Sequence, residues 1–315
     1  MTVPDQREAV DPESLRPRRR SKVVDLATAV QMVRPGTSVC IGGFLYHNRP
    51  AAFVRELIRR RIGDLTLFSS PSSSYEADLL LGSGLVKKAY LANVVFEYMG
   101  LAPNYRKAWE TGSVEMVECE EATIIGGFMA TVEGLAYHPV QSLKGTEVLK
   151  VSELCKKFMS IDGVEMLAVP ALKPDVAVLH AQQADEYGNI RYLGASFADI
   201  LIAKASGKVI VTVDEIVSTS TVQNEPWRTT IPGYIVEAVV EVPYGAHPSS
   251  SHCRYVHDED HLRAYIAAAE ESRREPDSGK YEEYVRKFVD EPADHFDYLD
   301  RVGGLARLTG LKKDW

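Results

Sequence analysis

The sequence contains no uninterrupted apolar run of about 18 residues, the length that a membrane-spanning helix needs, so we expect no membrane partner. Cysteines are few and too widely spaced for the paired ligands of a zinc site, which predicts reduced thiols and no metal. The basic run 16–20 is not followed by an apolar stretch of the kind found in signal peptides, which favours a cytoplasmic protein. The cysteines are Cys40, Cys119, Cys155 and Cys253.

The chain also lacks an excess of positive charge, since 36 Lys and Arg residues face 44 Asp and Glu residues, for a formal net charge of −8. Nucleic-acid binding requires clustered basic residues in excess, so we expect no nucleic-acid partner. No phosphate-loop or dinucleotide fingerprint is present, and no tightly bound cofactor is predicted. What remains is an ordinary globular composition, with 45% hydrophobic and 25% charged residues over 315 positions.

One stretch, residues 37–50, organises the rest of the chain. It reads as a buried strand over 38–41, then Gly42-Gly43, then a helix that opens at Pro50 and runs over 51–61. Residues without a Cβ allow a sharp turn or a close approach of a ligand to the backbone. The free N–H groups of the helix point back at this turn, which predicts hydrogen-bond donors for a carbonyl or an anion. Simple packing of strand against helix is the alternative.

Strand and helix patterns alternate along the rest of the chain. This alternation predicts an α/β fold in one domain, with an open, mostly parallel sheet and flanking helices. From about residue 258 the sequence is charged and helical. The predicted helices are 21–33, 76–81, 103–111 and 120–133, and the predicted strands are 65–68, 86–92, 114–119, 166–171, 176–179, 190–193, 209–213 and 236–242.

Polar residues follow two of these strands. Ser69 and Ser70 come directly after strand 65–68, and ligands bind at the carboxyl ends of strands in open α/β sheets. A serine-rich linker would explain them equally well. Glu120 and Glu121 follow strand 114–119 at the start of a helix, where stabilisation of the helix end is the simplest explanation.

The run Gly42-Gly43-Phe44, followed by Asn48 and Pro50, resembles the Gly-Gly-Phe signature of family I coenzyme A transferases, where glycine is common at the Asn48 position. Asparagine tolerates left-handed backbone conformations better than most residues, so this departure keeps the turn possible. Three further segments resemble the A subunit of that family. They are 134–139 with 145–147, 184–189, and 245–248.

The resemblance implies an open α/β fold in each of two subunits, with the active site at their interface. In the family the nucleophilic glutamate belongs to the B subunit, so we expect a B-type partner in a hetero-oligomer. The implied substrates are a coenzyme A thioester and a carboxylate. The A subunit would bind the substrate through Gly42, Gly43, Phe44, Asn48, Ser69 and Ser70.

The resemblance also suggests boundaries and alternatives. We expect a flexible tail over 1–21, a coenzyme A transferase A-type domain over 22–290, and a segment over 291–315 that frays or wraps a partner. Some relatives, the steroid-ring-cleaving hydrolases, hydrolyse a carbon–carbon bond in a cyclic coenzyme A thioester, and Glu121 matches the position of their acidic residue. In that alternative Glu121 is a catalytic general base. A non-catalytic scaffold subunit is the third alternative.

Overall fold

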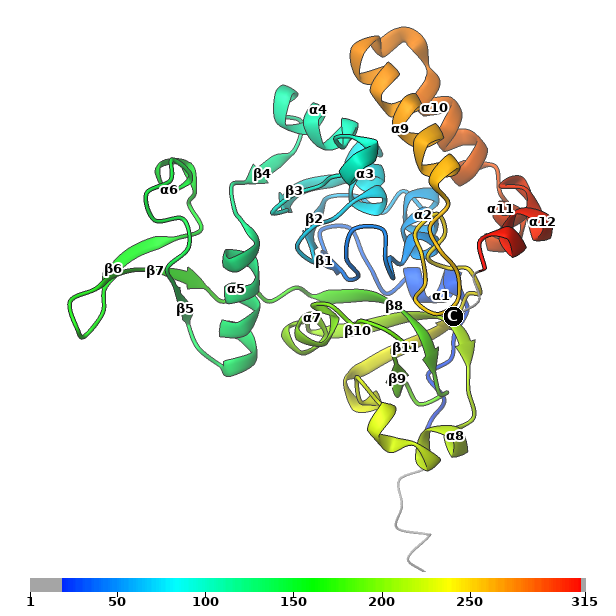
Figure 1. Cartoon of the computed structure of the whole chain (residues 1–315), viewed down its shortest axis with the longest axis horizontal. Helices are drawn as coiled ribbons and strands as arrows, with labels where there is room; N and C mark the ends of the chain where they lie inside the picture. Colours follow the sequence, from blue (N-terminus) through cyan, green and yellow to red (C-terminus); the bar gives the residue numbers. More distant parts are fainter. Residues whose placement is uncertain (1–18, 313–315) are drawn as a thin grey trace, which may run out of the picture.

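The computed structural model describes residues 19–312. Its main feature is an eight-stranded sheet in the order β11-β10-β8-β1-β2-β3-β4, with β9 pairing antiparallel to β8 and all other pairs parallel (Figure 1). The predicted open, mostly parallel sheet is therefore confirmed. Its strands are β1 (Ser38–Ile41), β2 (Leu65–Ser69), β3 (Val86–Tyr90), β4 (Glu115–Val117), β8 (Val176–Ala184), β9 (Ile190–Arg191), β10 (Lys208–Ile216) and β11 (Val236–Glu241).

Helices cover both faces of this sheet, so its central strands are buried on both sides. In β1, Val39 and Ile41 face one core and Cys40 faces the other. One face carries α1 (Leu26–Val30), α2 (Ala51–Arg59), α3 (Tyr75–Gly82), α4 (Pro103–Thr111), α9 (Glu259–Arg274) and α10 (Lys280–Val285), and the other carries α5 (Glu121–Glu133) and α7 (Asp199–Ala205). No helix among the described residues is long and apolar enough to cross a membrane.

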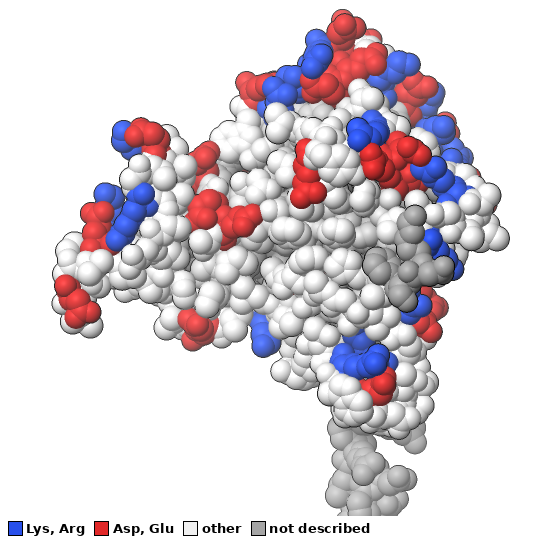
Figure 2. Space-filling model, viewed as in Figure 1, with Lys and Arg blue, Asp and Glu red and all other residues white. Residues whose placement is uncertain are grey.

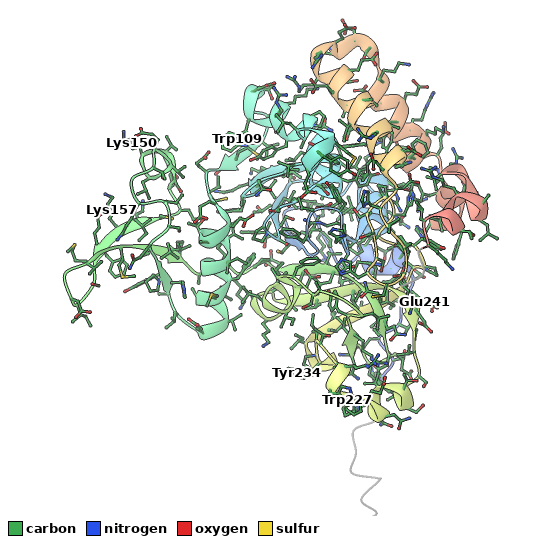
Figure 3. The ribbon with its side chains drawn as sticks, in the orientation of Figure 1. Trp109, Lys150, Lys157, Trp227, Tyr234 and Glu241 are labelled. Carbon is green, nitrogen blue, oxygen red and sulfur yellow. The ribbon has the colours of Figure 1, made fainter. Side chains whose placement is uncertain are left out.

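A second, three-stranded antiparallel sheet projects from the main body as an arm (Figure 1). It consists of β5 (Tyr137–Val140), β6 (Lys156–Met159) and β7 (Glu165–Pro170), with α6 (Val148–Val151) beside it. Lys150 and Lys157 mark this arm in Figure 3. The strand predicted over 166–171 exists as β7, but it belongs to this arm and not to the main sheet.

The carboxyl-terminal part of the chain packs against its own domain. Helices α11 (His295–Arg301) and α12 (Gly304–Gly310) bury Tyr298, Leu299 and Leu308 in a small core with Tyr255. The segment that we expected to fray or wrap a partner is thus folded onto this chain up to residue 312. Contact with a partner stays a prediction.

The remaining short elements are α8 (Thr219–Asn224), the 3-10 turns Glu97–Met99, Pro226–Arg228, Gly233–Ile235 and Pro276–Ser278, and a π-helical turn, Arg286–Asp290. Charged side chains gather over α9 and α10, whereas the face over the main sheet shows few of them (Figure 2). Glu270 accepts from Arg273 and Arg274 on α9. Such pairs are typical of a solvated helix surface.

The first helix is shorter than predicted. Residues before Leu26 are extended, and Val24 N–H donates to the Val239 carbonyl of β11 at 3.0 Å. The valines at helical spacing are partly used to cover the edge of the sheet, so the prediction of a helix from residue 21 was wrong. The predicted tail 1–21 lies almost entirely outside the described residues, and residues 19–21 have no regular structure.

Candidate active site

Four neighbouring strands end at one edge of the main sheet and deliver polar residues there. Strands β1, β2, β3 and β4 are parallel and adjacent. The chain beyond their carboxyl ends contains, in the same order, Gly43, Ser72, Asn93 and Glu121. Open α/β sheets bind ligands at this edge, which makes it the candidate active site.

The Gly42-Gly43 turn leaves β1 in a conformation that suits glycine. Gly43 has a φ of +86°, and a Cβ built on it would lie 2.5 Å from the carbonyl oxygen of His47. Both the backbone conformation and the returning chain therefore exclude a side chain. The group that approaches Gly43 closely is the chain itself, and the approach of a ligand to this backbone stays a prediction.

The amides of this turn are hydrogen-bonded within the chain. Gly42 N–H donates to the Val178 carbonyl at 3.0 Å, and Gly43 N–H donates to Asp199 Oδ1 at 2.7 Å. These amides, which we expected to face a substrate carbonyl or anion, are thus occupied in this structure. Direct contact of Gly42 or Gly43 with a substrate stays a prediction.

Asn48 ties the turn to two other loops. It is fully buried with a φ of +53°, in the left-handed conformation that its side chain tolerates. Its Oδ1 atom accepts from Gln182 Nε2 at 2.9 Å and from His252 N–H at 3.1 Å, and its Nδ2 donates to the Ala195 carbonyl at 3.0 Å. These hydrogen bonds make Asn48 a structural anchor between the turn and the two loops, and a contact of Asn48 with substrate stays a prediction.

A buried arginine that the sequence analysis missed supports the same loop. Arg49 donates to the carbonyls of Gly42 and Leu45, each at 2.8 Å, and lies 3.2 Å from Glu76 Oε1. Burial lowers the pKa of Arg49 and raises that of Glu76, while each charge opposes the shift of the other. An arginine beside a turn gives no sequence signal of burial, since most arginines are exposed.

Ser69 and Ser70 lie at the predicted edge, but both are 1% exposed. Ser69 Oγ accepts from Arg49 at 3.3 Å and from Ser73 at 2.5 Å, while Ser70 Oγ donates to the Gly43 carbonyl. Their hydroxyls hold the strand ends together. A contact of either serine with substrate stays a prediction.

The two adjacent glutamates have different surroundings. Glu120 is the N-cap of α5, and its carboxylate accepts from the backbone N–H of Thr123 at 3.0 Å in a capping box. Glu121 is exposed, and its Oε1 atom accepts from Ser72 Oγ at 2.7 Å and from Asn93 Nδ2 at 3.2 Å. Helix stabilisation therefore accounts for Glu120, whereas Glu121 faces the candidate site.

Ser72 and Asn93 are the site residues that the sequence analysis did not single out. Asn93 Oδ1 is buried and has no hydrogen-bond partner among the described residues, which leaves an acceptor for a ligand or a water. Asn93 directly follows the strand predicted over 86–92, and that position was the available signal. Ser72 lies within the serine run 69–74, where nothing in the sequence distinguishes it from its neighbours.

Aromatic side chains border the turn. Phe44 stacks on Phe197 with ring centroids 5.1 Å apart, and His47 lies 5.1 Å from His252 by the same measure. Burial lowers the pKa of His47 to about 4 and also lowers that of His252, so both imidazoles are neutral at pH 7. This side of the site is aromatic and carries no charge from these four residues.

Within residues 19–312, no three His, Cys, Asp or Glu side chains gather in a way that could hold a metal ion. The chemistry that these residues can supply is hydrogen bonding by Ser72 and Asn93 and a carboxylate at Glu121.

Comparison with known proteins places this geometry in a family. Residues 23–242 match the model of the family described as Coenzyme A transferase. The A subunit of glutaconate CoA-transferase from Acidaminococcus fermentans is 33% identical in an alignment 313 positions long, which covers 93% of this chain and 95% of that protein. A crystal structure of that transferase superposes with a TM-score of 0.88 at 29% identity, over 93% of this chain and 96% of that chain.

Two other relatives extend the comparison. A longer, uncharacterised protein of Archaeoglobus fulgidus is 34% identical over 283 residues. The alignment covers 89% of this chain but only 62% of that protein. The IpdA subunit of the cholesterol ring-cleaving hydrolase of Rhodococcus jostii is 29% identical in an alignment 295 positions long, which covers 87% of this chain and 99% of that relative. The chain therefore belongs to the coenzyme A transferase family of enzymes, as the Gly-Gly-Phe turn at the carboxyl edge of its sheet indicated.

Proposed function

We propose that this chain is the A subunit of an acyl-coenzyme A:carboxylate coenzyme A transferase built from two kinds of subunit, with the nucleophilic glutamate on a B-type partner. One observation carries the proposal: the likeness to the A subunit of glutaconate CoA-transferase extends along nearly the whole length of both chains, in sequence and in fold. In this proposal Glu121, whose Oε1 atom is held by Ser72 and Asn93, is not the nucleophile.

In this proposal the partner's glutamate attacks the thioester carbonyl of an acyl-coenzyme A. A carbon–oxygen bond forms, the carbon–sulfur bond breaks, and the coenzyme A thiolate leaves behind an acyl anhydride. The thiolate then attacks the glutamyl carbonyl, which releases the acid and leaves coenzyme A on the glutamate as a thioester. A second carboxylate reverses both steps. This chain would hold the acyl group at the polar edge formed by Ser72 and Asn93, a positioning role that can contribute several kcal/mol.

A hydrolase of the ring-opening type is the second candidate, and the position of Glu121 favours it. Glu121 is exposed at the sheet edge and is not needed as the helix cap, because Glu120 fills that place. A carboxylate held by Ser72 and Asn93 is oriented as a general base for water would be. The likeness to the IpdA subunit points to the same chemistry.

The arm supports the expectation of a partner. It exposes Val151, Met159 and Ile161, with the Ile161 side chain fully accessible, and such apolar groups are typical of surfaces that bind another protein. A B-type chain is the partner that we propose, and a cytoplasmic location goes with it.

A protein that serves only as a scaffold is the remaining alternative. In that case no variant at the sheet edge would change the rate.

Reconstitution with the partner tests the proposed function. The purified chain and a B-type chain, alone and mixed, are assayed for transfer of coenzyme A from an acyl thioester to a carboxylate and for water-dependent opening of a cyclic coenzyme A thioester. We expect transfer by the mixture and by neither chain alone. Ring opening without transfer would replace the transferase with the hydrolase.

A further inference from the structure

Asp199, the first residue of α7, is buried directly behind the Gly42-Gly43 turn. Its side chain is 0% exposed, and its Oδ1 atom accepts the Gly43 N–H at 2.7 Å. Its Oδ2 atom accepts the hydroxyl of Tyr192 at 2.6 Å. A Cβ on Gly42 would lie 2.5 Å from Asp199 Oδ1, so the carboxylate and the turn are packed without a gap.

Helix capping does not explain this aspartate. The N-cap of α7 is Ala198, and no side chain caps the helix. Both oxygens of Asp199 point instead to partners outside α7, one on the turn and one after β9. A buried carboxylate requires such donors, since desolvation raises its pKa, here to about 6.

The hydrogen bonds continue from Asp199 to the neighbouring strand end. Tyr192 donates to Asp199, which holds Gly43 N–H, and the Gly43 carbonyl accepts the hydroxyl of Ser70. Ser70 precedes the segment that places Ser72 beside Glu121. Direct hydrogen bonds therefore connect Asp199 to two of the four strand ends that form the candidate site, those of β1 and β2.

We propose that Asp199 is a positioning residue, which fixes the Gly42-Gly43 turn and, through the Gly43 carbonyl, the serine segment after β2. It does not touch the substrate in this role. Its effect on rate rests on the proposed function, whereas its effect on the turn does not.

The chain contains a matched control in Asp78 of α3. Asp78 is also 0% exposed, and it also accepts one backbone N–H, from Tyr105 at 2.7 Å, and one tyrosine hydroxyl, from Tyr265 at 2.7 Å. Burial raises its pKa to about 6 as well. These contacts join α3 to α4 and α9, and none of them involves the Gly-Gly turn. Asp78 Oδ2 also accepts from Asn104 Nδ2 at 3.2 Å, so loss of Asp78 removes the same two kinds of hydrogen bond as loss of Asp199, and one more.

The test compares Asp199→Ala, Asp199→Asn and Asp78→Ala in the full chain assembled with its B-type partner. Deuterium uptake of peptides covering 42–48 reports on the turn, kcat reports on the site, and thermal melting reports on stability. For Asp199→Ala we expect exchange in 42–48 to be at least about ten-fold faster and kcat to fall about 10- to 100-fold, as for an active-site displacement of about 1 Å. For Asp199→Asn, the deuterium exchange of residues 42–48 and kcat should both stay within about three-fold of wild type, because the amide oxygen still accepts the Gly43 N–H.

Asp78→Ala should lower the melting temperature at least as much as Asp199→Ala does. It should leave both the deuterium exchange of residues 42–48 and kcat within about three-fold of wild type. If Asp199→Ala matches Asp78→Ala in exchange and in kcat, the inference is overturned although the transferase stands. If the assembled complex transfers no coenzyme A, the proposed function fails, and the exchange data still decide whether Asp199 holds the turn. Should Asp199→Ala not fold, Tyr192→Phe keeps the carboxylate, removes one donor, and is expected to give a smaller change in the same direction.

Discussion

At the scale of single residues, the adjacent glutamates Glu120 and Glu121 have different roles: one stabilises a helix and the other lies at the candidate site. Both follow the same strand and both could stabilise the same helix end. The capping box assigns that task to Glu120, and the hydroxyl of Ser72 and the amide of Asn93 hold Glu121 at the site. The sequence could indicate the pair but not this division, because it depends on contacts with residues far away in the chain.

Replacing each glutamate by glutamine or alanine tests the division. Glu120→Ala removes the cap and should cost about 0.5–2 kcal/mol in the free energy of unfolding, measured by urea denaturation. Glu121→Gln should leave that energy nearly unchanged. In a transferase the Glu121→Gln complex should keep most of its rate, whereas in a hydrolase it should lose about 100- to 10,000-fold. A large rate loss confined to Glu120→Ala would contradict both assignments.

A second residue-scale prediction concerns Gly43, with Gly36 as its control. Both have a left-handed φ, +86° and +83°, but a Cβ on Gly36 meets nothing within 4 Å. Gly36→Ala should therefore cost only the backbone term of about 1–2 kcal/mol. Gly43→Ala should cost more, because the new methyl group meets the His47 and Asn48 carbonyls, and it should also reduce kcat.

Urea denaturation and turnover of the two alanine variants provide the measurement. Equal losses of stability in the two variants would contradict this prediction, because they would show that the backbone at His47 and Asn48 moves away from the new methyl group at little cost. A valine at this position is expected to displace the turn, since φ of +86° is outside the range of a β-branched residue.

At the scale of elements, the sequence predicted what depends on periodicity and missed what depends on pairing. The core strands β1, β8 and β10 appear as apolar runs, which is typical of strands buried on both faces. Strands β5 and β6 could not be predicted in this way. Pro139 interrupts the pattern of β5, and β6 reads Lys-Lys-Phe-Met, so both exist because they pair with β7.

The candidate site was predictable in outline for the same reason. Parallel strands end at the same edge of a sheet, so the predicted strand ends were enough to place Gly43 and Ser70 at that edge, where the structure has them. Asp199, Arg49 and Asn93 were not predicted, because their role comes from contacts between segments that are distant in sequence.

Asn48 yields a prediction about how loops are joined. Asn48→Gly keeps the left-handed backbone conformation but removes hydrogen bonds to Gln182, Ala195 and the backbone of His252. We expect a loss of about 1–3 kcal/mol in the free energy of unfolding, since buried partners are left unsatisfied. Faster deuterium exchange over 194–198 and 249–253 should accompany it. Unchanged exchange in both loops would mean that Asn48 does not anchor them.

At the scale of the whole molecule, buried titrating groups make stability depend on pH in two opposite ways. Burial lowers the pKa of His295 to about 3, so between pH 6.5 and 3 the unfolded chain binds a proton that the folded chain does not. Acidification through this range therefore destabilises the fold through His295. Asp199, with its pKa raised to about 6, acts in the reverse sense, because the folded chain takes up the proton first.

Two variants separate these contributions. Between pH 7 and pH 5, His295→Gln should make the loss of unfolding free energy on acidification shallower, and Asp199→Asn should make it steeper. Each change is at most about 1.4 kcal/mol per pH unit, the limit for one proton. Urea denaturation at intervals of half a pH unit measures the slopes. Shifts of the same sign in both variants would contradict these assignments.

The central claim, that this chain works as the A subunit of a coenzyme A transferase, is tested most directly by locating the covalent intermediate. The complex with its B-type partner is incubated with an acyl-coenzyme A, reduced with borohydride and digested, and the peptides of both chains are analysed by mass spectrometry. We predict one reduced glutamate, on the partner, and none in this chain. A reduced Glu121, or coenzyme A transfer by this chain without the partner, would contradict the claim.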